Sequence, residues 1–106
     1  MAIPSVPLFG NPTRVTADVA IKASPGKIWA VLLAGGTTDS YIKFYDHISE
    51  ASGTNVLSVV APCITDTASG RSTVFVSFVE LGGIDCAAGI WADWNGTGCV
   101  GHVWFS

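Results

Sequence analysis

Short runs of β-forming residues follow one another from Thr13 to Phe105, and turns rich in Gly, Ser, Thr and Asn separate them. Within the runs, apolar and polar residues alternate with a period of two, which sets one side of each strand against a core. No helical period longer than a turn or two interrupts the series. The pattern predicts an all-β fold: a single antiparallel β-sandwich of about seven short strands with jelly-roll-like connections.

The first half of the chain predicts three strands in a meander. Alternation over Thr13–Lys22 indicates the first strand, and Pro25-Gly26 indicates a type II turn that needs a positive φ at Gly26. The run Lys27–Leu33 is apolar on both faces, which is typical of a central strand. The run Tyr41–Asp46 alternates cleanly, with its two tyrosines and its lysine directed outward.

The second half predicts four more strands, at Val56–Ala61, Thr73–Leu81, Ile84–Trp91 and Cys99–Phe105. The strongest strand signal is that of Thr73–Leu81. The glycine pair after it indicates a hairpin to the strand at Ile84–Trp91. Helices are expected to be almost absent. No further domain boundary is evident after residue 13, so residues 13–106 are predicted to form one sandwich domain.

Residues 1–12 differ from the rest, because they hold three of the five prolines and no charge. Such a segment cannot form a helix and makes a poor central strand. We interpret it as an extended arm that lies in a groove of a partner; a frayed terminus is the alternative. The apolar side chains that the arm would insert are Ile3, Val6, Leu8 and Phe9.

Charge and hydropathy exclude two classes of partner. Five basic residues against eight acidic ones give a formal charge of −3, and the basic residues are scattered, so a nucleic acid is not an expected partner. No apolar run approaches the ~20 residues that cross a bilayer, so an integral membrane protein is not expected either. The first residues do not form a cationic and then apolar leader, so synthesis in a cytoplasm is expected.

The three cysteines, Cys63, Cys86 and Cys99, are widely spaced and form no C-x-x-C motif. We interpret them as buried thiols that act as small apolar groups. The alternative is a disulfide between Cys86 and Cys99, since both fall in the last two expected strands. Such a bridge would form after release into an oxidising medium.

The sequence offers little chemistry for catalysis. The only histidines are His47 and His102, and neither stands at ligand spacing from a cysteine or a carboxylate. Asp46 and His47 are neighbours, but adjacent residues on an extended chain point in opposite directions. We therefore expect no enzyme, no catalytic residue, no metal site and no cofactor.

Aromatic side chains are a more informative feature, above all the four tryptophans Trp29, Trp91, Trp94 and Trp104. They can fill the core or a subunit interface, form a protein-binding patch, or form a platform on which sugar rings stack. A sugar site also needs carboxylates and amides, and near these tryptophans only Asp93 and Asn95 qualify. We favour the core or an interface.

Two segments carry a resemblance to a known group of proteins: Ile21-Lys22-Ala23-Ser24-Pro25-Gly26-Lys27-Ile28-Trp29 and Tyr41-Ile42-Lys43-Phe44-Tyr45-Asp46. They resemble the K-A-S-P-G-K-L-Y and Y-L-K-L-Y-D segments of small structural proteins of tailed bacteriophages. The likeness covers Thr13–Asp46. It implies a β-sandwich of the virion, of the capsid cement or decoration type, made in the host cytoplasm and placed on the capsid surface.

That resemblance also implies a partner and a role. A cement protein binds the outer capsid surface and stabilises the joints between capsomers of the major capsid protein, commonly as a homotrimer. The second half of the chain, with its tryptophans, departs from the pattern. The alternative is therefore a tail- or fibre-associated virion protein that binds a host receptor or glycan.

Overall fold

The computed structural model describes residues 12–36, 39–49, 53–61 and 73–106. The four apolar residues expected on the arm lie outside the described residues, as does Cys63. The expected boundary between the arm and the sandwich therefore falls where the described part of the chain begins.

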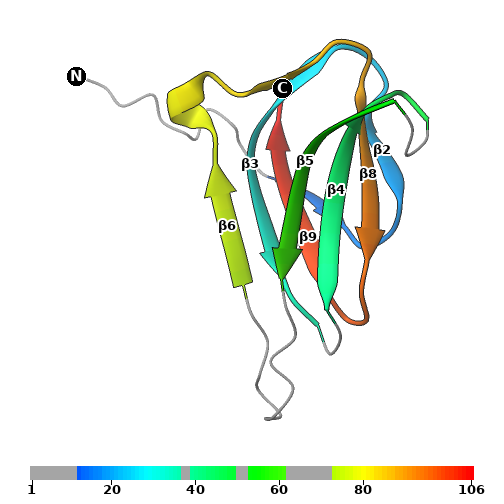
Figure 1. Ribbon diagram of the computed structural model, residues 1–106, viewed down its shortest axis with the longest axis vertical. Helices are drawn as coiled ribbons and strands as arrows, with labels where there is room; N and C mark the ends of the chain where they lie inside the picture. The colour runs from blue at the N-terminus through cyan, green and yellow to red at the C-terminus, as the bar shows by residue number, and fades with distance from the viewer. Residues whose placement is uncertain (1–11, 37–38, 50–52, 62–72) are drawn as a thin grey trace.

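Two antiparallel sheets pack against each other in the described part of the chain (Figure 1). Sheet A has the order β1 (Thr13–Val15), β9 (Val100–Phe105), β3 (Gly26–Ala34) and β6 (Thr73–Ser77), and β7 (Ile84–Cys86) pairs with the other end of β3. Sheet B has the order β2 (Val19–Lys22), β8 (Ile90–Asn95), β4 (Ser40–Asp46) and β5 (Thr54–Ala61). The predicted all-β sandwich is confirmed.

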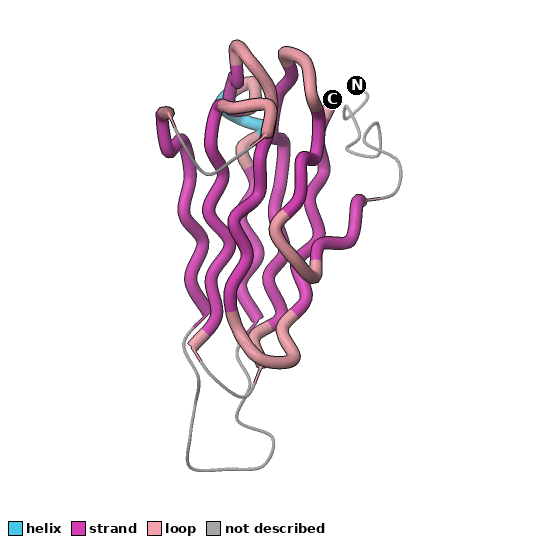
Figure 2. Tube along the Cα trace, turned by 90° about the vertical axis from the view of Figure 1, so that its right-hand side faces the viewer, coloured by secondary structure: helices cyan, strands magenta, loops and turns pink. Residues whose placement is uncertain are grey.

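The strands run side by side along the length of the molecule (Figure 2). The only helical element among the described residues is the single 3₁₀ turn η2 (Val79–Leu81). The prediction of a nearly helix-free chain is confirmed for this part of it.

The first expected strand is wrong as a single element, because the chain changes sheet within it. β1 belongs to sheet A, β2 belongs to sheet B, and bends at residues 16–18 separate them. Asp18 fixes the crossing, since its Oδ1 accepts a hydrogen bond of 2.8 Å from the backbone N–H of Trp94. The expected three-strand meander is wrong for the same reason, because β2, β3 and β4 alternate between the sheets.

Gly26 is needed for space rather than for a turn. Its φ is not positive, so the expected type II turn is wrong at this position. A Cβ at Gly26 would run into the backbone oxygen of Ser106. That contact arises because Lys27 and Ser106 exchange two backbone hydrogen bonds of 3.0 Å each, which bring the end of the chain against the start of β3.

The second half of the chain also departs from the expected strands. The strand expected at Thr73–Leu81 stops at Ser77, and η2 follows it. Gly82 and Gly83 do adopt positive φ values, but they lead into β7, which pairs with β3 and not with β6. The expected hairpin is wrong, because β6 and β7 both pair with β3 and not with each other. The strand expected at Ile84–Trp91 likewise divides between β7 and β8, which lie in different sheets.

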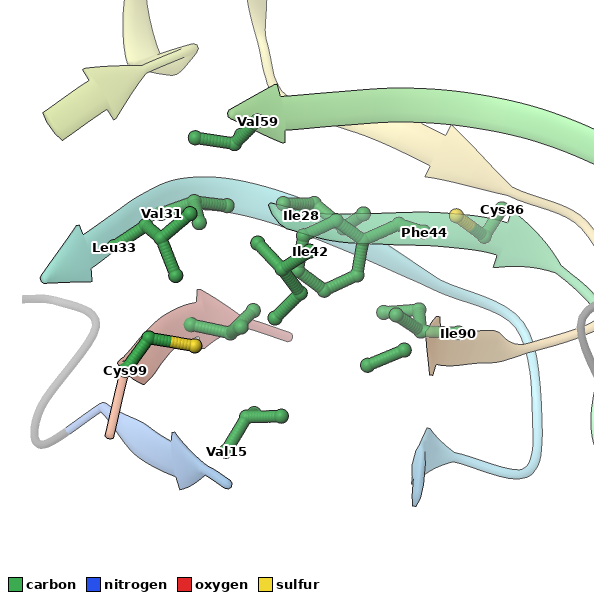
Figure 3. Packing of buried hydrophobic residues seen from close by; sticks show 12 residues of the cluster. Val15, Ile28, Val31, Leu33, Ile42, Phe44, Val59, Cys86, Ile90 and Cys99 are labelled. Carbon is green, nitrogen blue, oxygen red and sulfur yellow. The ribbon is translucent and has the colours of Figure 1, made fainter. Parts of the chain in front are cut away.

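The core lies between the sheets and is built from the inward residues of each strand (Figure 3). β3 is central in sheet A, as predicted, because β9 pairs with one of its sides and β6 and β7 pair with the other. In β4, Ile42 and Phe44 are fully buried, which confirms the predicted inward side of that strand. Burial of each large side chain contributes about 1.5–3 kcal/mol. Twelve buried residues form the cluster: Val15, Ile28, Val31, Leu33, Ile42, Phe44, Val59, Cys86, Ile90, Ala92, Cys99 and Val103.

Cys86 and Cys99 are both buried in this core and both are free thiols. Figure 3 shows them at opposite ends of the cluster, so the disulfide considered between them is not formed. Burial raises the pKa of the Cys86 thiol to about 11, with a further contribution from the carboxylates of Asp46 and Asp85. The two cysteines act as small apolar core residues.

Candidate interaction surfaces

The outward side chains of β6 and of the segments of β3 and β9 beside it, residues 30–34 and 100–104, form one continuous block, which we call the A face. Register places Leu32 between Phe75 on one side and His102 on the other, and it places Ala30 beside Trp104. No member of the block is a lysine, arginine, aspartate or glutamate. The A face consists of Ala30, Leu32, Ala34, Thr73, Phe75, Ser77, Val100, His102 and Trp104.

An aromatic pair dominates the A face. The rings of Phe75 and Trp104 meet edge to face, with their centroids 5.9 Å apart and their planes at 88°. Phe75 is nevertheless 58% exposed, although it is large and apolar. Charged groups flank the block: Arg14 pairs with His102 in register, and Lys27 forms an ion pair of 3.6 Å with Asp85. The A face is thus an uncharged area with Arg14 beside its middle row and the Lys27–Asp85 pair beyond one end.

The edge strands β5 and β6 have no charge and no proline in their described sequences, TNVLSVVA and TVFVS. Among the described residues, β5 pairs only with β4 and β6 pairs only with β3. Soluble proteins usually protect edges with charges, prolines or bulges, because a bare edge recruits other strands. β5 has one such irregularity, a register shift opposite Phe44 and Tyr45, whereas the pairing of β6 with β3 is regular. Val60 of β5 is also 54% exposed. These edges are suited to contact with another chain.

The outward side chains of β4 and β8 form a second block, which we call the B face. Register pairs Tyr41 with Asn95, Lys43 with Asp93, and Tyr45 with Trp91. These six residues make up the B face. The residues between them, such as Ile42 and Phe44, are buried, so the predicted outward direction of the two tyrosines and the lysine is confirmed.

Lys43 and Asp93 face each other at the centre of the B face, and we call this pair its middle row. The ammonium group of Lys43 lies 4.6 Å from the ring centroid of Tyr41, a cation–π geometry. Burial and the neighbouring carboxylate of Asp18 raise the pKa of Asp93, and Lys43 partly opposes that rise. The middle row therefore combines one cation with one carboxyl group that gains a proton more readily than usual.

Asp46 has a structural role that the sequence did not reveal. Its carboxylate accepts backbone hydrogen bonds from Ala87 at 3.0 Å, Ala88 at 2.7 Å and Gly89 at 3.3 Å. The bond from Ala88 is the main cause that lowers the pKa of Asp46. This carboxylate ties the turn between β7 and β8 to the end of β4. Its neighbour His47 accepts a bond from the backbone N–H of Ser49, so each member of the pair has a local structural partner.

The four tryptophans have four different positions. Trp94 packs against the core, Trp91 is on the B face and Trp104 is on the A face. Trp29 donates from Nε1 to the hydroxyl of Ser106 at 2.9 Å, and the ammonium of Lys27 lies 5.5 Å from its ring. Trp94 is therefore a core residue, and for the other three, which lie on outer surfaces, the interface interpretation stays a prediction.

Among the described residues, three buried side-chain polar atoms have no hydrogen-bond partner: Nε1 of Trp91, Nε1 of Trp94 and Nδ1 of His102. Each such group costs about 1–3 kcal/mol relative to a satisfied one. Trp91 and His102 belong to the two outer faces, one to each. Each face therefore contains one aromatic ring with a buried polar atom that no described residue satisfies.

Metal-ligating side chains do not gather within the described ranges, where no group of three or more His, Cys, Asp or Glu residues occurs. No helix in that part of the chain is both long and apolar enough to cross a membrane. Comparison with protein families, with curated proteins and with solved structures found no match to this chain. The case for a function therefore depends on the two faces and the edges.

Proposed function

We propose that this protein is a structural component of a tailed-phage virion, a capsid cement or decoration protein. It binds the outer capsid surface and stabilises the joints between capsomers of the major capsid protein. The observation that carries the proposal is the A face, where nine outward side chains include no lysine, arginine or acidic residue and the largest exposed one is Phe75. A surface of this kind gains stability when another protein covers it.

The energetics of covering the A face suit a mechanical role. Apolar area removed from water contributes about 25 cal/mol per Å², so full burial of a side chain such as Phe75 contributes about 1.5–3 kcal/mol. Contacts of this size are modest in one copy. They become effective when many copies each bridge a joint between capsomers, because separation of the shell then requires all of them to be broken.

The strand orders of the two sheets support a jelly-roll fold. Orders β1-β9-β3-β6 and β2-β8-β4-β5, with repeated crossings between the sheets, fit a jelly roll. Jelly rolls occur in viral capsid domains and also in lectins, so this inference about the fold is compatible with the proposal but does not select it.

The proposed assembly is a homotrimer. A closed ring of three copies can cover edges such as β5 and β6, which have no second strand partner among the described residues. The arm of residues 1–12 is proposed to anchor the ring, because Ile3, Val6, Leu8 and Phe9 offer apolar contacts without any charge. Major capsid protein subunits are the proposed partner of both the arm and the A face.

The test is occupancy on the virion that carries this chain, measured by electron cryo-microscopy. Phe75→Ser removes the most exposed aromatic of the A face and is expected to lower occupancy strongly. The matched control is Leu81→Ser, since Leu81 is 78% exposed but lies on η2, outside both faces. Equal, full occupancy of folded Phe75→Ser protein, or absence of the wild-type chain from the capsid shell, overturns the proposal.

A further inference from the structure

The B face has the composition of a binding site that core packing does not require. Ile42 and Phe44, which alternate with its residues along β4, already supply the buried side of the strand. Tyr41, Tyr45 and Trp91 point the other way, and each is half-buried. Three aromatic rings on the outward side of two adjacent strands therefore need an explanation other than the domain's own core.

The arrangement of the six residues is ordered by row. Tyr45 and Trp91 form an aromatic row at one end, Lys43 and Asp93 form a charged row in the middle, and Tyr41 and Asn95 form the third row. Residues 41 to 45 of an extended strand span roughly 14 Å. Aromatic groups therefore lie at both ends of a strip, with hydrogen-bonding groups between them.

This chemistry matches a sugar chain. The flat C–H faces of a pyranose ring pack on aromatic rings, while its hydroxyls need both donors and acceptors. Lys43 supplies a donor, Asp93 supplies a carboxyl group, and the Asn95 amide supplies both. The indole N–H of Trp91 is buried and has no hydrogen-bond partner among the described residues, so it is an unused donor beside this row.

Charge selects a neutral ligand. Lys43 and Asp93 stand opposite each other in register, and Asp18 is near enough to Asp93 to raise its pKa, so the strip has no excess of cations for an acidic glycan or a phosphate. Two carboxyl groups without a third ligand do not make a metal site either. We infer that the B face binds neutral β-linked oligosaccharides of about three sugars, with Tyr45 and Trp91 as the stacking platform.

This inference goes beyond the proposed cement role and does not depend on it. The B face belongs to sheet B and the A face belongs to sheet A, on the other side of the shared core. A cement protein that buries the A face can keep the B face directed away from the shell. Either inference can fail while the other stands, because sugar binding is tested in solution and the cement role is tested on particles.

The experiment is an NMR titration of the full ¹⁵N-labelled chain with cellotriose and, separately, with chitotriose. Binding in the millimolar range is expected, with shifts at the Trp91 indole N–H and at the amides of Lys43, Tyr45 and Asp93. Signals of Phe75 and Trp104 are expected to stay in place. Glucose, a single ring, is expected to bind more weakly because it cannot span the rows. No shift with either trisaccharide, or shifts centred outside the B face, overturns the inference.

Two variants at one position sharpen the result. Tyr45→Phe keeps the ring and is expected to retain most of the affinity, whereas Tyr45→Ala removes the platform and is expected to weaken binding about tenfold or more. Phe75→Ala, on the opposite face, is the control and should bind like the wild type. Equal affinity of folded Tyr45→Ala and wild-type protein contradicts the assigned platform. If Tyr45→Ala does not fold, the shift map of the wild-type chain decides.

Discussion

The two outer faces of the sandwich obey the same alternation but differ in what they present. The A face has nine side chains on three strands and no lysine, arginine or acidic residue. The B face has six side chains on two strands and includes Lys43 and Asp93 in register. Since both sheets share one core, the difference cannot arise from packing inside the domain. We propose different surroundings as its cause: another protein over the A face, and water or a polar ligand over the B face.

The largest expected effect concerns the core that both faces share. Phe44 is the largest fully buried side chain among the described residues, so Phe44→Ala is expected to lower the free energy of unfolding by about 3–5 kcal/mol. Urea denaturation checks this value. Both faces should be lost together, because one cluster supports both sheets. A variant that loses less than about 1 kcal/mol would show that the two sheets do not depend on this common core.

The next effect is expected at Asp46, which links β4 of sheet B to the turn before β8. Asp46→Ala removes the acceptor of three backbone N–H groups and is expected to cost about 1–2 kcal/mol, a range that allows for the exposure of these bonds. Asp46→Asn keeps one acceptor oxygen and should cost less. Thermal unfolding at neutral pH measures both variants.

The pH dependence of the wild type gives a second reading of Asp46. Folding lowers its pKa, so its contribution to stability is present above the unfolded value of about 4 and is lost as the pH falls through the folded pKa. Asp46→Ala should therefore differ most from the wild type at neutral pH and least in acid. An equal difference at both pH values would contradict the role of the carboxylate charge.

At Phe75 the two faces are expected to separate in behaviour. Phe75→Ser should change the free energy of unfolding of the isolated chain by less than about 1 kcal/mol, because the side chain is more than half exposed. Its effect should appear in binding to the capsid, with less protein co-sedimenting with virion shells than for the wild type. Leu81→Ser is the matched control and should co-sediment like the wild type. Equal binding of the wild type and of Phe75→Ser removes the A face from the capsid contact.

The smallest expected effect is at Asp93 on the B face. Folding raises its pKa, so the ionised carboxylate is disfavoured in the folded state: the penalty is absent below the unfolded value of about 4 and grows as the pH rises through the folded pKa. Asp93→Asn should therefore be slightly more stable than the wild type at neutral pH, by less than about 1 kcal/mol, and equal to it in acid. Denaturant titrations at pH values on both sides of this window provide the measurement, and a less stable variant at neutral pH would contradict the sign.

Local pattern was sufficient to predict the class of fold and the inner sides of several strands. The alternation of β4 assigned Ile42 and Phe44 to the core, and the apolar run of β3 assigned it to the centre of a sheet. The crossings between sheets had no comparable signal. The sequence alternates through residues 13–22, but the structure does not follow it: Ala17 lies in the bend at residues 16–18 and is exposed, and Val19 of β2 is 39% exposed.

The parts that sequence reasoning missed depend on residues far apart in the chain. Gly26 is required by the approach of Ser106, and Asp46 is held by a turn more than 40 residues later. The composition of the two faces also depends on residues far apart in the chain. The outward direction of Tyr41 and Tyr45 was predictable, but their placement beside Trp91 and Asn95 required the register of β8 on β4. The A face was not predicted, because its three strands are not consecutive in the chain.

Hydroxyl-radical footprinting of the chain, free in solution and on the virion, tests most directly whether the A face is the contact buried on the particle. Phe75 and Trp104 are expected to become protected on the particle, whereas Tyr41 and Tyr45 are expected to react equally in both states. Unchanged reactivity of Phe75 and Trp104, together with new protection of Tyr45, would contradict this expectation, because the buried contact would then lie on the B face.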